Sequence, residues 1–307
     1  MKKINKIILL TLLFSGVLTI KSYAQQESQF TQYMYNTATI NPAYVGSHGT
    51  LDIISLYRNQ WAGLNGAPKT LNLTGGSPIG ENLGLGLSFV QDEIGPSEES
   101  TIAVDFSYTL NLQNDLKFSF GLKGGINLLN IDYSVLNIDP DEVFQFNVDN
   151  RLTPIIGVGA YLFKENWYAG LSVPNLLETT HYDDSAISNA TEKAHFYAIG
   201  GYVFDLNKNL KLKPAVMAKF TSGAPVAIDM SANFLLYEKI TLGASYRVDA
   251  AVSGLAGFQI SDMLTVGYAY DYSTSNLGNY NSGSHEIFLR FELVRYDRCK
   301  CVSPRFF

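Results

Sequence analysis

The sequence predicts an all-β protein that closes into a transmembrane barrel of about 14 antiparallel strands. Three observations lead to this fold. Apolar residues alternate with small or polar ones over most of the chain, 46% of the residues are hydrophobic while only 16% are charged, and the mean hydropathy is +0.03. A typical soluble domain carries about 25% charged residues. Alternation gives each strand one apolar face, which suits a barrel wall whose outer side contacts lipid.

The first 24 residues have the pattern of a secretory leader. Three lysines within the first six residues precede an apolar run over residues 7–20, and the small-x-small triplet at 22–24 follows it. A spanning helix needs about 20 apolar residues, so the run is short for an uncleaved anchor, which is the alternative. We expect cleavage after Ala24, which removes four lysines and changes the formal net charge from −6 to −10.

Residues 25–49 show no two-residue period but hold many aromatic side chains and the dipeptide Asn41-Pro42. A stretch this aromatic is expected to fold back into the periplasmic mouth or the lumen as a plug-like segment, and a disordered leader is the alternative. Its candidate partner-binding residues are Phe30, Tyr33, Asn36, Asn41, Pro42 and Tyr44.

From residue 51 onward, windows of about ten residues alternate with a period of two. In one of them, Phe118, Phe120 and Leu122 share a face, and the opposite face carries Lys117 and Ser119. A soluble sandwich or propeller would have a charged outer face, whereas here the second face is rich in Gly, Ser, Thr and Asn, which favours a barrel lumen. The predicted strands lie near 51–58, 69–75, 83–90, 102–110, 116–127, 153–162, 167–173, 196–206, 210–220, 226–236, 240–249, 252–260, 264–272 and 286–293.

The connections between these strands alternate in length. Links on the side of both barrel termini are short, and most links on the opposite side are long, as in bacterial outer-membrane barrels with short periplasmic turns. The long links are predicted at 59–68, 91–100, 129–150, 174–191 and 273–284, with short exceptions at 221–224 and 249–251. Aromatic residues near predicted strand ends are expected in the two interface belts, namely Trp61, Tyr108, Tyr161, Trp167, Tyr202, Tyr246 and Tyr272.

Charged residues on the predicted lumen face are expected to pair across neighbouring strands and stiffen the interior. They are Lys117, Lys123, Lys211, Lys213, Lys219 and Arg247, with Asp105, Asp229, Asp249, Asp271 and Glu292. The four histidines have no metal-binding spacing, and no nucleophile and base are placed together, so we expect neither an enzyme nor a cofactor. The acidic net charge argues against nucleic acid as a partner. Acidic stretches such as Glu98-Glu99 are read as solvated outer loops, with calcium binding as the alternative.

Two motifs after the leader resemble the signature of a known family. Residues 29–36 read QFTQYMYN and residues 40–46 read INPAYVG, which is similar to the start of the PorP/SprF family; YRNQW at 57–61, APKT at 67–70 and SVPNLL at 172–177 extend the similarity along the chain. The resemblance implies an outer-membrane protein of type IX secretion and gliding motility. It also implies partners, namely the C-terminal sorting domain of a large secreted adhesin and the translocon or its periplasmic ring proteins.

The last thirteen residues follow the final predicted strand and are basic, with Arg295, Arg298, Lys300 and Arg305 beside Cys299 and Cys301. We expect a periplasmic docking peptide, and a solvated tail is the alternative; the redox state of the cysteines stays open. The domain order is a leader (1–24), an N-terminal segment (25–49), a barrel in outer-membrane lipid (50–294) and a tail (295–307). The function predicted from this order and the resemblance is non-enzymatic adhesin secretion or anchoring. A channel for small hydrophobic or sugar solutes is the alternative.

Overall fold

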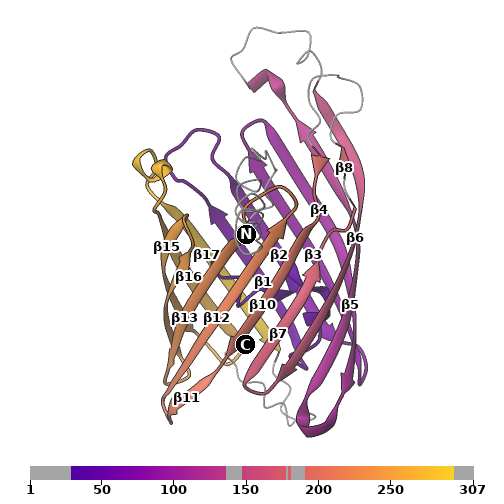
Figure 1. Cartoon of the computed structure of the whole chain (residues 1–307), viewed down its shortest axis with the longest axis vertical. Coiled ribbons are helices and arrows are strands. Elements are labelled where there is room, and N and C mark those ends of the chain that lie inside the picture. The colour runs from indigo at the N-terminus through magenta and orange to yellow at the C-terminus, as the bar shows by residue number, and fades with distance from the viewer. Residues whose placement is uncertain (1–28, 136–146, 178, 181–190, 294–307) are drawn as a thin grey trace, which may run out of the picture.

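The computed structural model describes residues 29–135, 147–177, 179–180 and 191–293, and it is a closed antiparallel barrel (Figure 1). Its strands are β1 (Leu51–Asn59), β2 (Lys69–Pro78), β3 (Leu83–Ile94), β4 (Ser97–Asn111), β5 (Lys117–Ile131), β6 (Val148–Lys164), β7 (Trp167–Val173), β10 (His195–Tyr202), β11 (Phe204–Asn207), β12 (Leu210–Thr221), β13 (Ala227–Leu236), β14 (Ile240–Arg247), β15 (Ala251–Gln259), β16 (Leu264–Ser273) and β17 (Ser284–Leu293). Because β11 continues β10 along β12, the wall has the fourteen strands that the sequence predicts.

The wall closes where the first strand meets the last. β1 pairs with β17 over nine residues, from Leu51 opposite Leu293 to Asn59 opposite His285, and β7 pairs with β10 across the long link 174–194. Two short strands, β8 (Thr179–Thr180) and β9 (Thr191–Glu192), pair within that link. Closure satisfies the backbone groups of every strand within the sheet, which a structure in hydrocarbon requires.

The alternation seen in the sequence separates an apolar outer surface from a polar interior. On β4, Val104 and Phe106 are exposed on the outside, while Ala103, Asp105 and Ser107 are buried on the inside. The other strands continue this pattern, so large apolar residues cover the outer wall and Gly, Ser, Thr, Asn and charged residues line the interior. No helix in the described ranges is long and apolar enough to cross a membrane.

The links confirm the predicted asymmetry of the two ends. Those at the end where β1 starts and β17 finishes are short, at 79–82, 112–116, 165–166, 208–209, 237–239 and 260–263. Opposite links include the longer 60–68, 132–147, 174–194 and 274–283. By the usual topology of outer-membrane barrels, the short-turn end is periplasmic and the other end extracellular.

One predicted outer link, 91–100, is wrong. β3 and β4 continue to Ile94 and Ser97, leaving a two-residue turn in which Gly95 has a φ of +57°. The polar residues of this stretch suggest a loop, yet they pair across the two strands, with Glu93 opposite Glu98 and Gln91 Nε2 donating to Glu98 Oε1 at 2.7 Å. A hairpin that extends beyond the membrane into water can keep the backbone hydrogen bonds between its strands while its side chains are polar.

The interface belt is confirmed in part. Tyr108, Tyr202, Tyr246 and Tyr272 are exposed on the outer wall near strand ends. Tyr161 is wrongly placed in the prediction, because it is 3% exposed and faces the interior. It shares its side of β6 with the buried Thr153 and Ile155, and its ring lies 5.4 Å from that of Tyr44.

Candidate functional site

Residues 29–50, which include the described part of the predicted segment 25–49 and are called the N-terminal segment from here on, lie against the inner faces of the strands. The segment holds a single helical turn, α2 (Thr37–Ile40), and a 3-10 turn, η1 (Pro42–Tyr44), and most of its side chains are buried. Gln29 Nε2 donates to Asp229 Oδ2 at 2.8 Å near the extracellular end of β13, and Thr50 leads into β1 at the periplasmic end. The segment therefore runs through the barrel from the extracellular half to the periplasmic rim.

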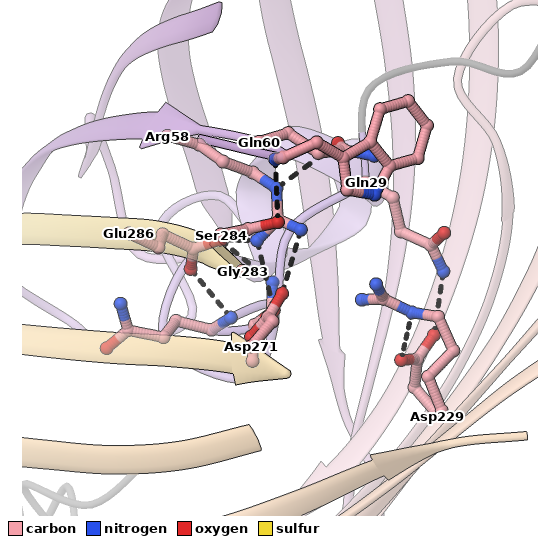
Figure 2. Close-up of polar contacts among 12 residues, drawn as sticks. Gln29, Arg58, Gln60, Asp229, Asp271, Gly283, Ser284 and Glu286 are labelled. Carbon is pink, nitrogen blue, oxygen red and sulfur yellow. Dashed lines mark hydrogen bonds and ion pairs between the residues drawn. The ribbon is translucent and has the colours of Figure 1, made fainter. Parts of the chain in front are cut away.

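An ion cluster in the extracellular half, the Arg58 cluster, holds the start of the segment (Figure 2). Arg58 Nη2 lies 2.8 Å from Asp271 Oδ2, and Arg58 Nη1 lies 3.0 Å from Glu286 Oε2. The two Glu286 oxygens accept the backbone N–H groups of Thr31 and Gln32 at 2.9 and 2.8 Å, and the Thr31 hydroxyl donates to Asp271 at 2.6 Å. All three charged side chains are at most 3% exposed. One cation and three neutral donors thus stabilise two buried carboxylates.

Two cross-strand ion pairs confirm part of the expected pairing of lumen charges. Arg247 Nε donates to Asp229 Oδ1 at 2.7 Å, directly across β13 and β14, and this is the same carboxylate that accepts from Gln29. Lys123 lies 3.3 Å from Asp105 across β4 and β5. Such pairs cross-link neighbouring strands inside the barrel, and the first also ties the segment to the wall.

Polar groups of the segment are also held in the middle of the barrel. Asn36 Nδ2 donates to Asn72 Oδ1 at 2.9 Å. Lys213 Nζ donates to the carbonyl oxygen of Met34 at 3.2 Å and lies 5.4 Å and 5.7 Å from the ring centroids of Tyr35 and Tyr168. Cation–π contacts of this kind gain strength when the cation is desolvated. The Lys213 ammonium group therefore contacts both the segment and the wall.

In the periplasmic half the segment approaches the wall so closely that only glycine fits. Asn41 is fully buried; its Oδ1 accepts from Ala43 N at 3.0 Å and caps η1, and its Nδ2 donates to Ala160 O at 3.1 Å. A Cβ atom on Gly121 would lie 2.1 Å from Ala43 N, and one on Gly159 would lie 2.1 Å from Asn41 Oδ1. These lumen glycines leave the space into which Asn41 and η1 fit.

The segment ends at a second ion pair on the seam between β1 and β17. Arg290 donates to both carboxylate oxygens of Asp52, at 2.8 Å and 3.0 Å, and its Nη2 lies 3.2 Å from His48 Nε2. The hydroxyl of Tyr44 contacts the same His48 nitrogen. Burial, with a smaller contribution from Arg290, lowers the pKa of His48 to about 4.

This pKa predicts a pH-dependent docking of the segment. An undocked His48 has a pKa near 6.5, so its protonation favours the undocked segment. The contribution of neutral His48 to docking is therefore fully present above pH 6.5 and is lost as the pH falls toward 4. Single-channel conductance in planar bilayers is expected to show more openings at pH 4.5 than at pH 7. His48→Gln, which does not protonate, should flatten that part of the profile; an unchanged profile would assign the effect to the carboxylates instead.

The six candidate residues of the predicted N-terminal site all lie inside the barrel, spread along the segment. Phe30 packs with Ile54, Leu56 and Phe288, and Tyr33, Asn36, Asn41, Pro42 and Tyr44 are likewise buried against the wall. Their contacts with a partner stay a prediction. The leader and the tail residues Arg295, Arg298, Arg305, Cys299 and Cys301 lie outside the described residues.

Arg58, Glu286, Asp52 and Arg290 were not among the lumen pairs expected from the sequence. Glu286 and Arg290 alternate with outward-facing apolar residues on β17, so the sequence pattern was sufficient to predict that both side chains face the interior. The direction of Arg58 was not, because β1 carries large apolar residues on both faces, with Ile53 exposed and Ile54 and Leu56 buried. Side-chain parity therefore could not identify its partners.

A model of the type IX secretion system membrane protein family PorP/SprF matches residues 22–291. The chain belongs to the PorP/SprF family. This match covers the N-terminal segment and nearly the whole wall, and it confirms the family that the sequence motifs resemble. Together with the closed barrel and its apolar outer surface, it makes the chain an outer-membrane PorP/SprF β-barrel of the type IX secretion system.

Solved structures similar to this PorP/SprF protein include an outer-membrane protein, a toluene transporter and a porin. The Acinetobacter baumannii protein Omp33 has 12% identity and a TM-score of 0.49, covering 80% of this chain and 98% of its own. The Ralstonia pickettii toluene transporter TbuX has 12% identity and a TM-score of 0.46, covering 90% and 99%. A triple mutant of the Rhodopseudomonas blastica porin has 9% identity and a TM-score of 0.34, covering 80% and 99%. No curated protein matches the sequence.

The described part of the barrel contains no group of three or more His, Cys, Asp or Glu side chains arranged to hold a metal ion. The acidic pair Glu98 and Glu99 lies on β4 rather than on a loop, and Glu99 accepts a hydrogen bond from Asn127 Nδ2. The buried charges described above contact one another and the segment. The chemistry of the interior is thus ion pairing and hydrogen bonding to a chain segment.

Proposed function

We propose that this barrel is a non-conducting receptor of the type IX secretion system. In this proposal it binds the C-terminal sorting domain of a large adhesin and supports the secretion of that adhesin or its anchoring at the cell surface. The observation that carries the proposal is the N-terminal segment, which runs through the barrel and is held by buried charges at both ends. It acts as a plug.

The energetics of the plug favour a scaffold over a pore. Removing the segment would leave the Glu286 carboxylate without the two backbone N–H groups it accepts from. Each buried hydrogen bond to a charged group contributes about 1.5–3 kcal/mol, so spontaneous withdrawal of the segment is costly. A solute channel would need a lumen that opens at low cost, whereas a receptor needs a rigid wall.

The two ends of the barrel would serve different partners. The extracellular links 132–147 and 174–194 are the longest, and they form the natural contact surface for an adhesin domain. The periplasmic end carries the short turns, and the basic tail with Arg295, Arg298 and Arg305 follows β17 there. In the proposal this end contacts the translocon or its periplasmic ring.

The test is an affinity pull-down combined with conductance recordings. Tagged barrel isolated from cells is expected to recover a surface adhesin, and the recovery should be lost when the adhesin lacks its C-terminal domain. Purified barrel in planar bilayers at neutral pH should show no steady conductance. Solute-dependent conductance without any adhesin in the pull-down would overturn the receptor proposal in favour of the transporter.

A further inference from the structure

The lipid-facing wall contains an apolar hollow near the short-turn end of β5, β6, β7, β10 and β12, which lie side by side (Figure 1). This outer hollow has a volume of about 510 Å³, within the range of about 300–1000 Å³ seen for ligand pockets. Every residue that lines it is Gly, Ala, Val, Leu, Ile or Phe. Because none of these side chains forms hydrogen bonds, the hollow suits a hydrocarbon group and no polar ligand.

The outer hollow forms where small outward-facing residues meet across neighbouring strands. Ala169 on β7 lies opposite Gly200 on β10, and Ala198 on β10 lies opposite Ala218 on β12. Leu171 lies beside them and stands out from the wall, with 65% of its surface exposed. A gap between side chains loses dispersion contacts unless other atoms fill it. A hydrocarbon chain in this hollow therefore gains contacts from several sides, whereas a flat wall contacts it from one side only.

The position of the outer hollow along the strands places it in the periplasmic leaflet, the leaflet that faces the periplasm. Ala198 lies four residues from Tyr202, the last residue of β10 at the short-turn end. Four residues span about 13 Å along a strand, which is about 10 Å of depth for a strand tilted by about 35–45°. The hydrocarbon core is about 30 Å thick, so each leaflet contributes about 15 Å. The chains that reach the hollow are therefore those of periplasmic-leaflet lipids.

The row of outward residues next to the hollow carries groups for a lipid headgroup. Lys164, Trp167 and Tyr202 are neighbours across β6, β7 and β10, and such residues mark the membrane interface. Within the described chain, Lys164 forms no ion pair with a carboxylate, the adjacent Glu165 included. The Tyr202 hydroxyl accepts a hydrogen bond from Asn166 Nδ2 at 2.8 Å, so its own proton is available to an acceptor outside the wall. Lys164 and Tyr202 lie roughly 10 Å apart across two strand spacings, which their side chains and one phosphodiester headgroup can bridge.

We propose that the outer hollow binds an anionic phospholipid of the periplasmic leaflet. One acyl chain lies over Ala169, Ala198 and Gly200, and the phosphate lies at the adjacent row, where the Lys164 ammonium group and the Tyr202 hydroxyl donate to its oxygens. The charge of Lys164 selects an anionic headgroup, because basic residues at a membrane surface attract anionic lipids. Binding at this site does not depend on adhesin recognition, so it goes beyond the receptor proposal.

Trp167 is a natural reporter for this site in the full-length barrel. The sequence has two tryptophans, so Trp61→Phe leaves Trp167 as the only one. This variant is reconstituted into phosphatidylcholine vesicles that contain phosphatidylglycerol with brominated acyl chains, and quenching of Trp167 fluorescence measures the lipid beside it. We expect phosphatidylglycerol to be enriched there about three- to fivefold over phosphatidylcholine brominated in the same way. Lys164→Gln should abolish this enrichment, whereas Glu165→Gln should preserve or raise it. Equal enrichment with and without the Lys164 charge would overturn the proposal.

Ala198→Leu tests the acyl-chain part of the site without changing any charge, because the larger side chain occupies the hollow. Native mass spectrometry of the detergent-solubilised barrel is expected to show phosphatidylglycerol retained by the parent protein and lost from Ala198→Leu. The matched control is Ala232→Leu, which faces outward on β13, likewise four residues from the short-turn end of its strand, and lies outside the lining. This control should retain the lipid. Retention by Ala198→Leu, or equal loss from both variants, would contradict binding in the hollow.

The same measurement on barrel isolated from its own membrane identifies the source of the acyl chain. A phospholipid is expected to stay bound to the parent protein and to be lost from Ala198→Leu. A lipid-modified protein that stays bound in its place, and is lost from Ala198→Leu, would refute the phospholipid as the occupant.

Discussion

Replacing Arg58 with methionine is expected to destabilise the barrel by about 3–5 kcal/mol and to release the N-terminal segment. The reason is that Asp271 and Glu286, which are 3% and 0% exposed, would then share the interior without their common cation. The measurement is urea unfolding of the purified barrel in lipid vesicles, followed by the difference in gel migration between folded and unfolded protein. Cleavage of the segment by chymotrypsin, which recognises its aromatic residues, reports release.

Lys69→Met is the control for this substitution. Lys69 pairs with Glu93 at 4.0 Å on the outside of the barrel, where both side chains are about half exposed. An exposed pair contributes at most about 1 kcal/mol, so this variant should unfold nearly as the parent does. Adding Asp271→Asn and Glu286→Gln to Arg58→Met should restore much of the stability, because neutral acceptors remain for the Thr31 and Gln32 donors. Equal effects of Arg58→Met and Lys69→Met would refute the role of the cluster.

Gly121→Ala is expected to displace the segment without changing any charge. A Cβ atom at residue 121 would lie 2.1 Å from Ala43 N and 2.3 Å from Pro42 C, both backbone atoms that cannot move aside alone. Overpacking of this kind costs about 1–3 kcal/mol. Because the cost falls on the segment and not on the strand ladder, the barrel should insert normally. Planar bilayers should then show conductance that the parent protein lacks.

Gly124→Ala, on the same strand, is the control that distinguishes displacement of the segment from a general effect of replacing glycine with alanine in β5. A Cβ atom there meets nothing within 4 Å, so this variant should insert and remain closed like the parent protein. Chymotrypsin should cut the segment in Gly121→Ala and spare it in Gly124→Ala. If both variants stay closed, the segment does not depend on contact at Gly121.

The sequence was sufficient for the fold because the relevant signal is local. Alternation of residues such as Ile102 to Tyr108 directly reports which face meets lipid, and it located all fourteen strands. The alternation was misleading where the surroundings of a residue, and not the sequence pattern, determine its position. Above the membrane, polar residues such as Glu93 and Glu98 continue the ladder, and inside the wall an aromatic residue such as Tyr161 packs against the segment.

The interior contacts were only partly predictable for a different reason. Asp105 with Lys123, and Asp229 with Arg247, are direct neighbours across adjacent strands, so register alone brings them together. Arg58 contacts residues more than 200 positions away, on two strands across the closing seam, and it also contacts Thr31. Such contacts depend on closure of the ring, which no local pattern encodes.

The direction of the N-terminal segment also fixes an order of events in biogenesis. The residues that hold Thr31 and Gln32 belong to β16 and β17, which are the last strands to be synthesised and exported. Thr31 and Gln32 therefore lack these carboxylate partners until the last strands have joined the wall. Full seating of the segment requires a completed barrel, and a truncated or half-assembled chain would leave Thr31 and Gln32 without these bonds.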